Sequence, residues 1–264
     1  MRKRRGRAAR GEGQALVRRA VARAIRIGML TPSTNTVLEP LTTAMVAGLQ
    51  GVSVHFQRFP VTEIALSERA LAQFDDASIL EAAALLAHAR TDVIAWNGTS
   101  SGWLGFAADE RLVARIELAT GAAATTAMLA LNEVLALRRV RSLGFVTPYL
   151  DAVQARIVAN YASLDYECRA ERHLGLSDNF SFAEVTHETI EEMVRAVAAA
   201  RPEAVAVICT NLRAAPLAAG LEAELGIPVY DTVAATVWKT LRLAGADPAR
   251  IEGWGSIFAT AAGG

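Results

Sequence analysis

The chain has 264 residues, of which 52% are hydrophobic and 20% are charged, and its formal net charge at pH 7 is zero. This composition is typical of a globular protein with a sizeable core, and the length suits one large α/β domain or two small ones. The charge is uneven, because residues 1–26 hold ten of the 27 basic residues and a single acid, Glu12. The remainder is net negative, which argues against a nucleic acid partner, and no run of 18 apolar residues indicates a membrane span.

Residues 1–23 open the chain as MRKRRGRAARGEGQALVRRAVAR. We expect a basic, disordered extension without a catalytic role, with a transit peptide or a leader as the alternatives.

Beyond the extension, short apolar runs rich in Val and Ile alternate with segments of helical spacing. The apolar runs predict six buried strands, at 25–30, 52–56, 93–96, 142–146, 204–208 and 228–230. Apolar residues three and four apart predict seven helices, at 77–89, 107–117, 124–137, 151–162, 186–199, 214–224 and 232–243. The alternation indicates βαβ units, and the continuous apolar strands indicate parallel sheets buried on both faces.

Three segments of the first half recur in the same order in the second half. The pairs are RIGMLTP (26–32) with SLGFVTP (142–148), DVIAWNGTSS (92–101) with AVAVICTNLR (204–213), and TGAAATTAMLALNEVL (120–135) with GIPVYDTVAATVWKTL (226–241). Two α/β halves related by pseudo-twofold symmetry explain the repeat, although a general likeness of α/β segments is the alternative. We predict a first half at 24–138, with the C-terminal segment 232–264 packing back on it, and a second half at 139–231.

Ligands of open α/β sheets bind beyond the carboxyl ends of the strands, so four strand-end loops form the candidate site. They lie at 31–36, 97–103, 147–150 and 209–213. The first loop offers hydroxyls and the amide of Asn35, which indicates either anion binding or plain helix capping. In the second loop, Gly98, Thr99 and Ser100 favour close backbone approach and an oxyanion nest, with a capped turn as the alternative.

The other two loops contribute Tyr149 and Cys209. Tyr149 either donates its O–H to a substrate carboxylate or packs at the rim of the sheet. Cys209 ends a buried strand ahead of Thr210 and Asn211, so we expect it to point into the cleft, where a helix N-terminus would favour its thiolate. An inert core cysteine is the alternative, and it is the interpretation given to Cys168. Two cysteines are too few for a disulfide framework, which predicts reduced thiols and a cytoplasmic location.

Signatures of a metal or a cofactor are missing from the sequence. No histidine has a His or Cys partner at metal-ligand spacing among His55, His88, His173 and His187. No glycine-rich phosphate loop occurs either. We therefore expect neither a metal nor a cofactor.

With these loops in place, the chain resembles the aspartate/glutamate racemase superfamily from about Arg26 to about Phe258. Within it, the chain looks closest to arylmalonate decarboxylases and maleate cis-trans isomerases. The resemblance implies two Rossmann-like α/β halves with a cleft between them, and it leaves a homo-oligomer open. Racemases of the superfamily use one cysteine from each half. Cys209 matches the second, but the first falls on Gly98, which argues against a two-cysteine racemase.

The decarboxylases have a Gly-Thr-Ser turn, which Gly98-Thr99-Ser100 matches. The resemblance implies that its hydroxyls and N–H groups form a dioxyanion hole with Tyr149, and that Cys209 protonates the carbanion-like intermediate. The decarboxylases usually follow that cysteine with Gly-Gly, whereas this chain has Thr210-Asn211, so this part of the oxyanion hole differs.

The isomerases have a Pro-Ser-Ser-Asn motif, which Pro32-Ser33-Thr34-Asn35 resembles. The resemblance implies that Asn35 holds one substrate carboxylate and that Asn179 holds the second. The isomerases usually need a nucleophilic cysteine where Gly98 stands.

We therefore predict an enzyme, either a lyase or an isomerase, whose partner is a small dicarboxylate substrate. The first hypothesis is a cofactor-independent decarboxylase of malonate-type diacids. Its catalytic residues would be Cys209, Thr99, Ser100 and Tyr149, and its substrate-binding residues Asn35, Gly98, Asn179, Thr210 and Asn211. The alternatives are a maleate cis-trans isomerase or another diacid isomerase or racemase, and a non-catalytic protein that binds small carboxylates. Cysteine introduced at Gly98 is expected to create racemase-like proton exchange.

Overall fold

The computed structural model describes residues 24–261, so the predicted extension at 1–23 and residues 262–264 lie outside the described residues. Two four-stranded sheets form the framework, and every strand pair in them is parallel. The first sheet has the order β2-β1-β3-β4 and consists of β1 (Ile25–Pro32), β2 (Val52–Phe59), β3 (Val93–Trp96) and β4 (Ala123–Thr126). The second has the order β6-β5-β7-β8 and consists of β5 (Ser142–Thr147), β6 (Glu167–His173), β7 (Ala204–Val207) and β8 (Val229–Asp231). The predicted α/β class with parallel sheets is confirmed.

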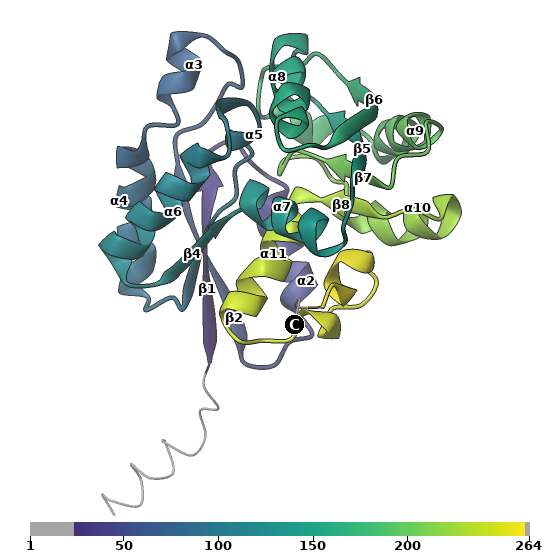
Figure 1. Cartoon of the computed structure of the whole chain (residues 1–264). Helices are drawn as coiled ribbons and strands as arrows, with labels where there is room; N and C mark the ends of the chain where they lie inside the picture. The colour runs from purple at the N-terminus through teal and green to yellow at the C-terminus, as the bar shows by residue number, and fades with distance from the viewer. Residues whose placement is uncertain (1–23, 262–264) are drawn as a thin grey trace, which may run out of the picture.

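Helices cover the two sheets, as Figure 1 shows. Those that follow strands of the first sheet are α2 (Leu38–Val46), α3 (Glu68–Ala72), α4 (Asp76–His88), α5 (Ser101–Leu104), α6 (Ala107–Thr120) and α7 (Ala127–Leu137). Those that follow strands of the second sheet are α8 (Asp151–Ala162), α9 (His187–Ala198), α10 (Ala218–Leu225) and α11 (Thr232–Leu243). Among residues 24–261, every helix is too short or too polar to cross a bilayer.

The two sheets repeat the same strand order, so the sequence repeat has a structural counterpart. Its three matched segments fall on β1 and β5, on β3 and β7, and on β4–α7 and β8–α11. Although α11 follows the second sheet, it packs against α7 and α2 and against β3 and β4 of the first sheet. Figure 1 shows α7 and α11 side by side between the halves. We therefore propose to count α11 and the chain after it with the first half.

The structure differs from the predicted elements where local pattern and tertiary position disagree. The helix predicted at 124–137 begins only at Ala127, because residues 123–126 form β4 and the Thr126 hydroxyl caps the helix by accepting from Leu129 N. The strand β6 was not predicted, because its sequence ECRAERH is charged and half-exposed, as befits an edge strand. The short helices α2, α3 and α5 were not predicted either.

Backbone contacts also join the halves directly, at a feature that we call the strap: residues 61–64 of the first half and 177–179 of the second. Ile64 N donates to Ser177 O (2.8 Å), and Asn179 N donates to Thr62 O (3.0 Å). Glu63 and Asp178 form an antiparallel bridge between these bonds. The two halves are therefore tied by backbone pairing.

Candidate active site

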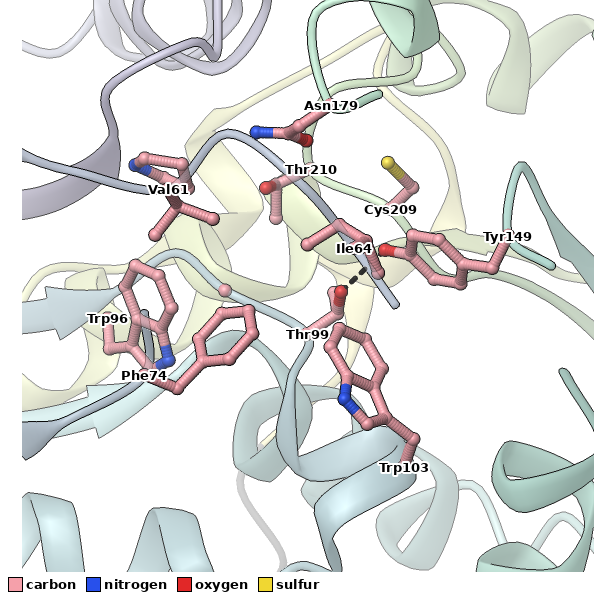
Figure 2. A pocket seen from close by; sticks show the side chains of 12 residues that line it. Val61, Ile64, Phe74, Trp96, Thr99, Trp103, Tyr149, Asn179, Cys209 and Thr210 are labelled. Atoms are coloured by element: carbon pink, nitrogen blue, oxygen red, sulfur yellow. Dashed lines mark hydrogen bonds between the residues drawn. The ribbon is translucent and has the colours of Figure 1, made fainter. Parts of the chain in front are cut away.

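A small pocket lies between the halves, next to the carboxyl ends of β3 and β7. β3 pairs with β1 in the first sheet, and β7 pairs with β5 in the second. The empty space in it amounts to about 280 Å³, including space open to solvent. Figure 2 shows the side chains around it. The lining residues are Pro32, Val61, Ile64, Phe74, Trp96, Gly98, Thr99, Trp103, Tyr149, Asn179, Cys209 and Thr210. Both halves contribute to this pocket, as the predicted cleft requires.

Cys209 brings a thiol into the pocket from the turn after β7, yet its side chain is only 2% exposed. Burial raises the pKa of the Cys209 thiol to about 12, with a smaller raising effect from Asp231. Hydrogen bonds oppose this shift without cancelling it, among them the bond that Asn211 N donates to Cys209 Sγ (3.3 Å). The thiol is therefore neutral at pH 7, contrary to the thiolate expected from the sequence, because desolvation outweighs the nearby N–H groups.

The hydroxyls of Thr99 and Tyr149, one from each half, lie 2.7 Å apart and form a buried hydrogen bond. The Tyr149 ring is held between Trp103 and Phe182, at centroid distances of 5.4 Å and 5.6 Å. Burial, followed by the effect of Cys209, raises the pKa of Tyr149 well above its ordinary value. Both hydroxyls are neutral, and because one O–H is used in their mutual hydrogen bond, the pair has one O–H left to donate toward the pocket.

Two turns in the site present backbone N–H groups that have no acceptor within residues 24–261. In the first half these are the N–H groups of Gly98, Thr99 and Ser100, and in the second half those of Cys209 and Thr210. Consecutive unpaired N–H groups are anion-binding features. The two turns therefore offer anion-binding donors from both sides of the cleft.

The predicted polar ligands divide into residues that line the pocket and residues that hold it together. Asn179 and Thr210 line it, while Asn35, Asn211 and Ser100 do not. Asn35 stabilises the turn that leads into α2, since its Oδ1 accepts from Val37 N and Leu38 N, both at 2.9 Å.

The amide of Asn211 is also engaged within the protein, because its Oδ1 accepts from Thr36 N (3.0 Å) and its Nδ2 donates to Asn179 O (2.5 Å). Ser100 stands just before α5 without a side-chain capping bond. A direct role in substrate binding or catalysis for Asn35, Asn211 and Ser100 stays a prediction.

Sequence reasoning missed the apolar part of the pocket. Its members are Val61, Ile64, Phe74, Trp96 and Trp103. The two tryptophans flank the turn at 98–100 in the sequence, which was an available signal. The other three come from the segment between β2 and α4, which carries no motif.

Metal ligands do not gather anywhere in the described part of the chain: residues 24–261 contain no group of three or more His, Cys, Asp and Glu side chains arranged to hold a metal ion.

Comparison with known proteins places these features in a family context. A family model described as arylmalonate decarboxylase matches residues 27–258. Arylmalonate decarboxylase from Bordetella bronchiseptica is 29% identical over 184 residues, which cover 69% of this chain and 77% of that protein. Maleate isomerase from Pseudomonas putida is 24% identical over 248 residues, which cover 89% of this chain and 98% of that protein.

Among solved structures, the fold is similar to that of a Nocardia farcinica maleate cis-trans isomerase. The TM-score is 0.81 at 21% identity, covering 90% of this chain and 99% of that one. That structure is of a cysteine-to-serine variant with a covalently bound succinylcysteine intermediate.

Proposed function

Because this chain belongs to the arylmalonate decarboxylase family, we propose that it is a cofactor-independent decarboxylase of malonic acids with an apolar group on the central carbon. The curated relatives are enzymes, a decarboxylase and isomerases, so the chain is a lyase or an isomerase. One observation supports the decarboxylase above all: a single neutral thiol shares a small pocket with two neutral hydroxyls and a set of apolar side chains.

In the first chemical step, the protein must stabilise negative charge that develops on the substrate. Loss of CO₂ leaves an electron pair on the central carbon, and the pair spreads into the remaining carboxylate as an enediolate. The hydroxyl pair of Thr99 and Tyr149, which has one O–H free of the mutual bond, and the unpaired N–H groups of 98–100 are donors in place before the charge develops. Removing one such donor typically lowers kcat by about 10²–10³.

The second step needs a proton, and a neutral thiol supplies one. The Cys209 S–H bond breaks, a C–H bond forms at the central carbon, and the resulting thiolate regains a proton from water. Burial that keeps the thiol protonated at pH 7 suits this role. The same burial disfavours a resting thiolate, which is the form that adds to a carbon–carbon double bond.

The apolar lining supports a substrate that carries an apolar substituent. Phe74, Trp96 and Trp103 offer aromatic surface, and Val61 and Ile64 offer aliphatic surface, on the walls of the pocket. An aryl or alkyl malonate buries its substituent there and gains free energy in proportion to the apolar area removed from water. Maleate has no substituent to place against these walls.

A maleate-type isomerase is the second candidate, favoured by the relative from Pseudomonas putida that matches 89% of this chain. The Nocardia farcinica structure carries its succinyl group on a cysteine although another cysteine has been replaced by serine, so that isomerase has at least two cysteines. The present chain has only Cys168 besides Cys209, and Cys168 lies on β6 and does not line the pocket. A second thiol for such chemistry is absent from this pocket.

Proton NMR in D₂O with phenylmalonate and with maleate separates the two candidates. We expect phenylacetate with deuterium at the central carbon, and no fumarate. The Cys209→Ser variant serves as the control for chemistry that does not depend on the thiol. Conversion of maleate alone would overturn the proposal in favour of the isomerase.

A further inference from the structure

Gly98, in the turn after β3, lies where there is no room for a side chain. Its backbone is not in the left-handed region that favours glycine. A Cβ atom built at this position would lie 1.8 Å from Cζ2 and 2.1 Å from Cε2 of Trp96, which no real contact allows. The indole of Trp96 therefore occupies the space that any side chain at position 98 would need.

Trp96 is held firmly in that place. It is the last residue of β3, its side chain is buried, and its ring packs against Phe59 with the centroids 5.0 Å apart. The ring also lines the pocket, and Figure 2 shows it on the side away from Cys209 and Tyr149. Moving a large, rigid ring out of a close-packed site would disrupt the packing of its neighbours.

We propose that Trp96 is the specificity-determining residue of this enzyme: its indole limits the size of the group on the reacting carbon and closes the side of the pocket opposite the thiol. The proposal rests on the decarboxylase function proposed above. A planar enediolate between the indole and Cys209 receives its proton from the Cys209 side alone, so the product has one handedness.

This arrangement revises one expectation from the sequence. Gly98→Cys by itself was expected to create racemase-like proton exchange. Its side chain would overlap with the indole, so exchange from that side requires a smaller residue at 96 as well.

The substrate arm of the test compares kcat/KM for phenylmalonate and for the larger 2-naphthylmalonate. Trp96→Phe keeps an aromatic ring against Phe59 and removes the part of the indole that reaches position 98. We expect it to raise the naphthyl-to-phenyl ratio by at least about tenfold. Phe145→Leu is the matched control, because it removes a buried aromatic ring that packs against Tyr161 and does not line the pocket, and the ratio should not change. An unchanged ratio in Trp96→Phe overturns the proposal.

The folding arm needs no turnover and so separates this proposal from the proposed function. Gly98→Ala should lower the thermal midpoint by about 5 °C in the wild-type chain, because the methyl group overpacks against the indole. In the Trp96→Phe chain the same substitution should change the midpoint little. An equal loss in both chains overturns the proposal, whereas absence of phenylmalonate turnover in the wild type overturns only the proposed function.

Discussion

Asn35, in the turn after the first strand, reaches across the cleft to Thr210, the residue that follows the thiol. Its Nδ2 donates to the Thr210 carbonyl oxygen (3.0 Å) and lies within hydrogen-bond distance of the Thr210 hydroxyl (3.2 Å). Thr210 in turn donates its hydroxyl to Asn97 O (2.9 Å), so the contact reaches the first-half turn that leads to Gly98. A single buried amide thus links the turns that follow β3 and β7.

Asn35→Ala should lower both stability and activity. It removes the two hydrogen bonds that hold the turn before α2 and leaves buried polar groups of the turn at Thr210 without partners, which costs about 2–4 kcal/mol in the free energy of unfolding. Because Thr210 adjoins Cys209, we also expect kcat to fall for phenylmalonate. Thr126→Ala is the control, since it removes the cap of α7 within one half. It should lower the unfolding midpoint with little effect on kcat, and equal kcat losses in both variants would contradict the assignment.

Cys209→Ala should abolish decarboxylation while the fold survives, because the small apolar residue fits a buried site but donates no proton. Cys209→Ser keeps a hydroxyl that is a much weaker acid, and kcat should fall by about 10²–10⁴. Steady-state rates and thermal unfolding measure the two effects. Cys168→Ser changes the other thiol, which does not line the pocket, and should leave kcat unchanged. Full activity in Cys209→Ala would refute the role of the thiol.

Tyr149→Phe should lower kcat by about 10²–10³, because it removes one fixed donor for the enediolate and leaves the Thr99 hydroxyl without its partner. Tyr161→Phe provides a matched loss of a buried tyrosine hydroxyl, which there bonds to Asn132 Oδ1 (2.9 Å) away from the pocket. The control should lose stability but little kcat. Combining Tyr149→Phe with Thr99→Val should cost less than the sum of the two single losses in activation free energy, because the two hydroxyls form one unit.

Stability should fall as the pH rises from about 4 to about 7, owing to one buried carboxyl. Burial raises the pKa of Asp231 from 3.8 to about 7, while Val233 N and Ala234 N donate to its Oδ1. The folded protein holds the proton more tightly than the unfolded chain, so this stabilisation is complete below pH 3.8 and is lost as the pH rises through 7. The loss is on the order of 4 kcal/mol.

Asp231→Asn keeps the capping oxygen and removes the titration, so it should flatten the pH dependence and raise stability at pH 8. Urea unfolding at pH 5 and pH 8 measures the difference. Asp109→Asn is a second test, because burial raises the pKa of Asp109, elsewhere in the protein, to about 6. Removing this carboxyl should flatten only the lower part of the curve of stability against pH. An undiminished pH dependence in Asp231→Asn would exclude that carboxyl as the cause.

The sequence could predict the site residues that come directly after a predicted strand. Thr99, Tyr149 and Cys209 each follow the end of a buried parallel strand, and such ends gather at one edge of a sheet. The repeat then indicated that two such edges face each other.

The rest depended on contacts between distant segments. β4 was hidden within an apolar helical pattern, and β6 is charged because it lies at a sheet edge. The packing of Trp96 against position 98 needs the actual orientation of a side chain, which no spacing rule supplies. The same holds for the protonation state of Cys209, because the sequence shows a nearby helix but not the depth of burial.

The strap ties the wall of the pocket to the pairing of the two halves. Val61, Ile64 and Asn179 are strap residues and also line the pocket, so a shift between the halves that breaks the two backbone hydrogen bonds also changes the shape of the pocket. The affinity for any ligand held there is therefore coupled to how the two halves are placed.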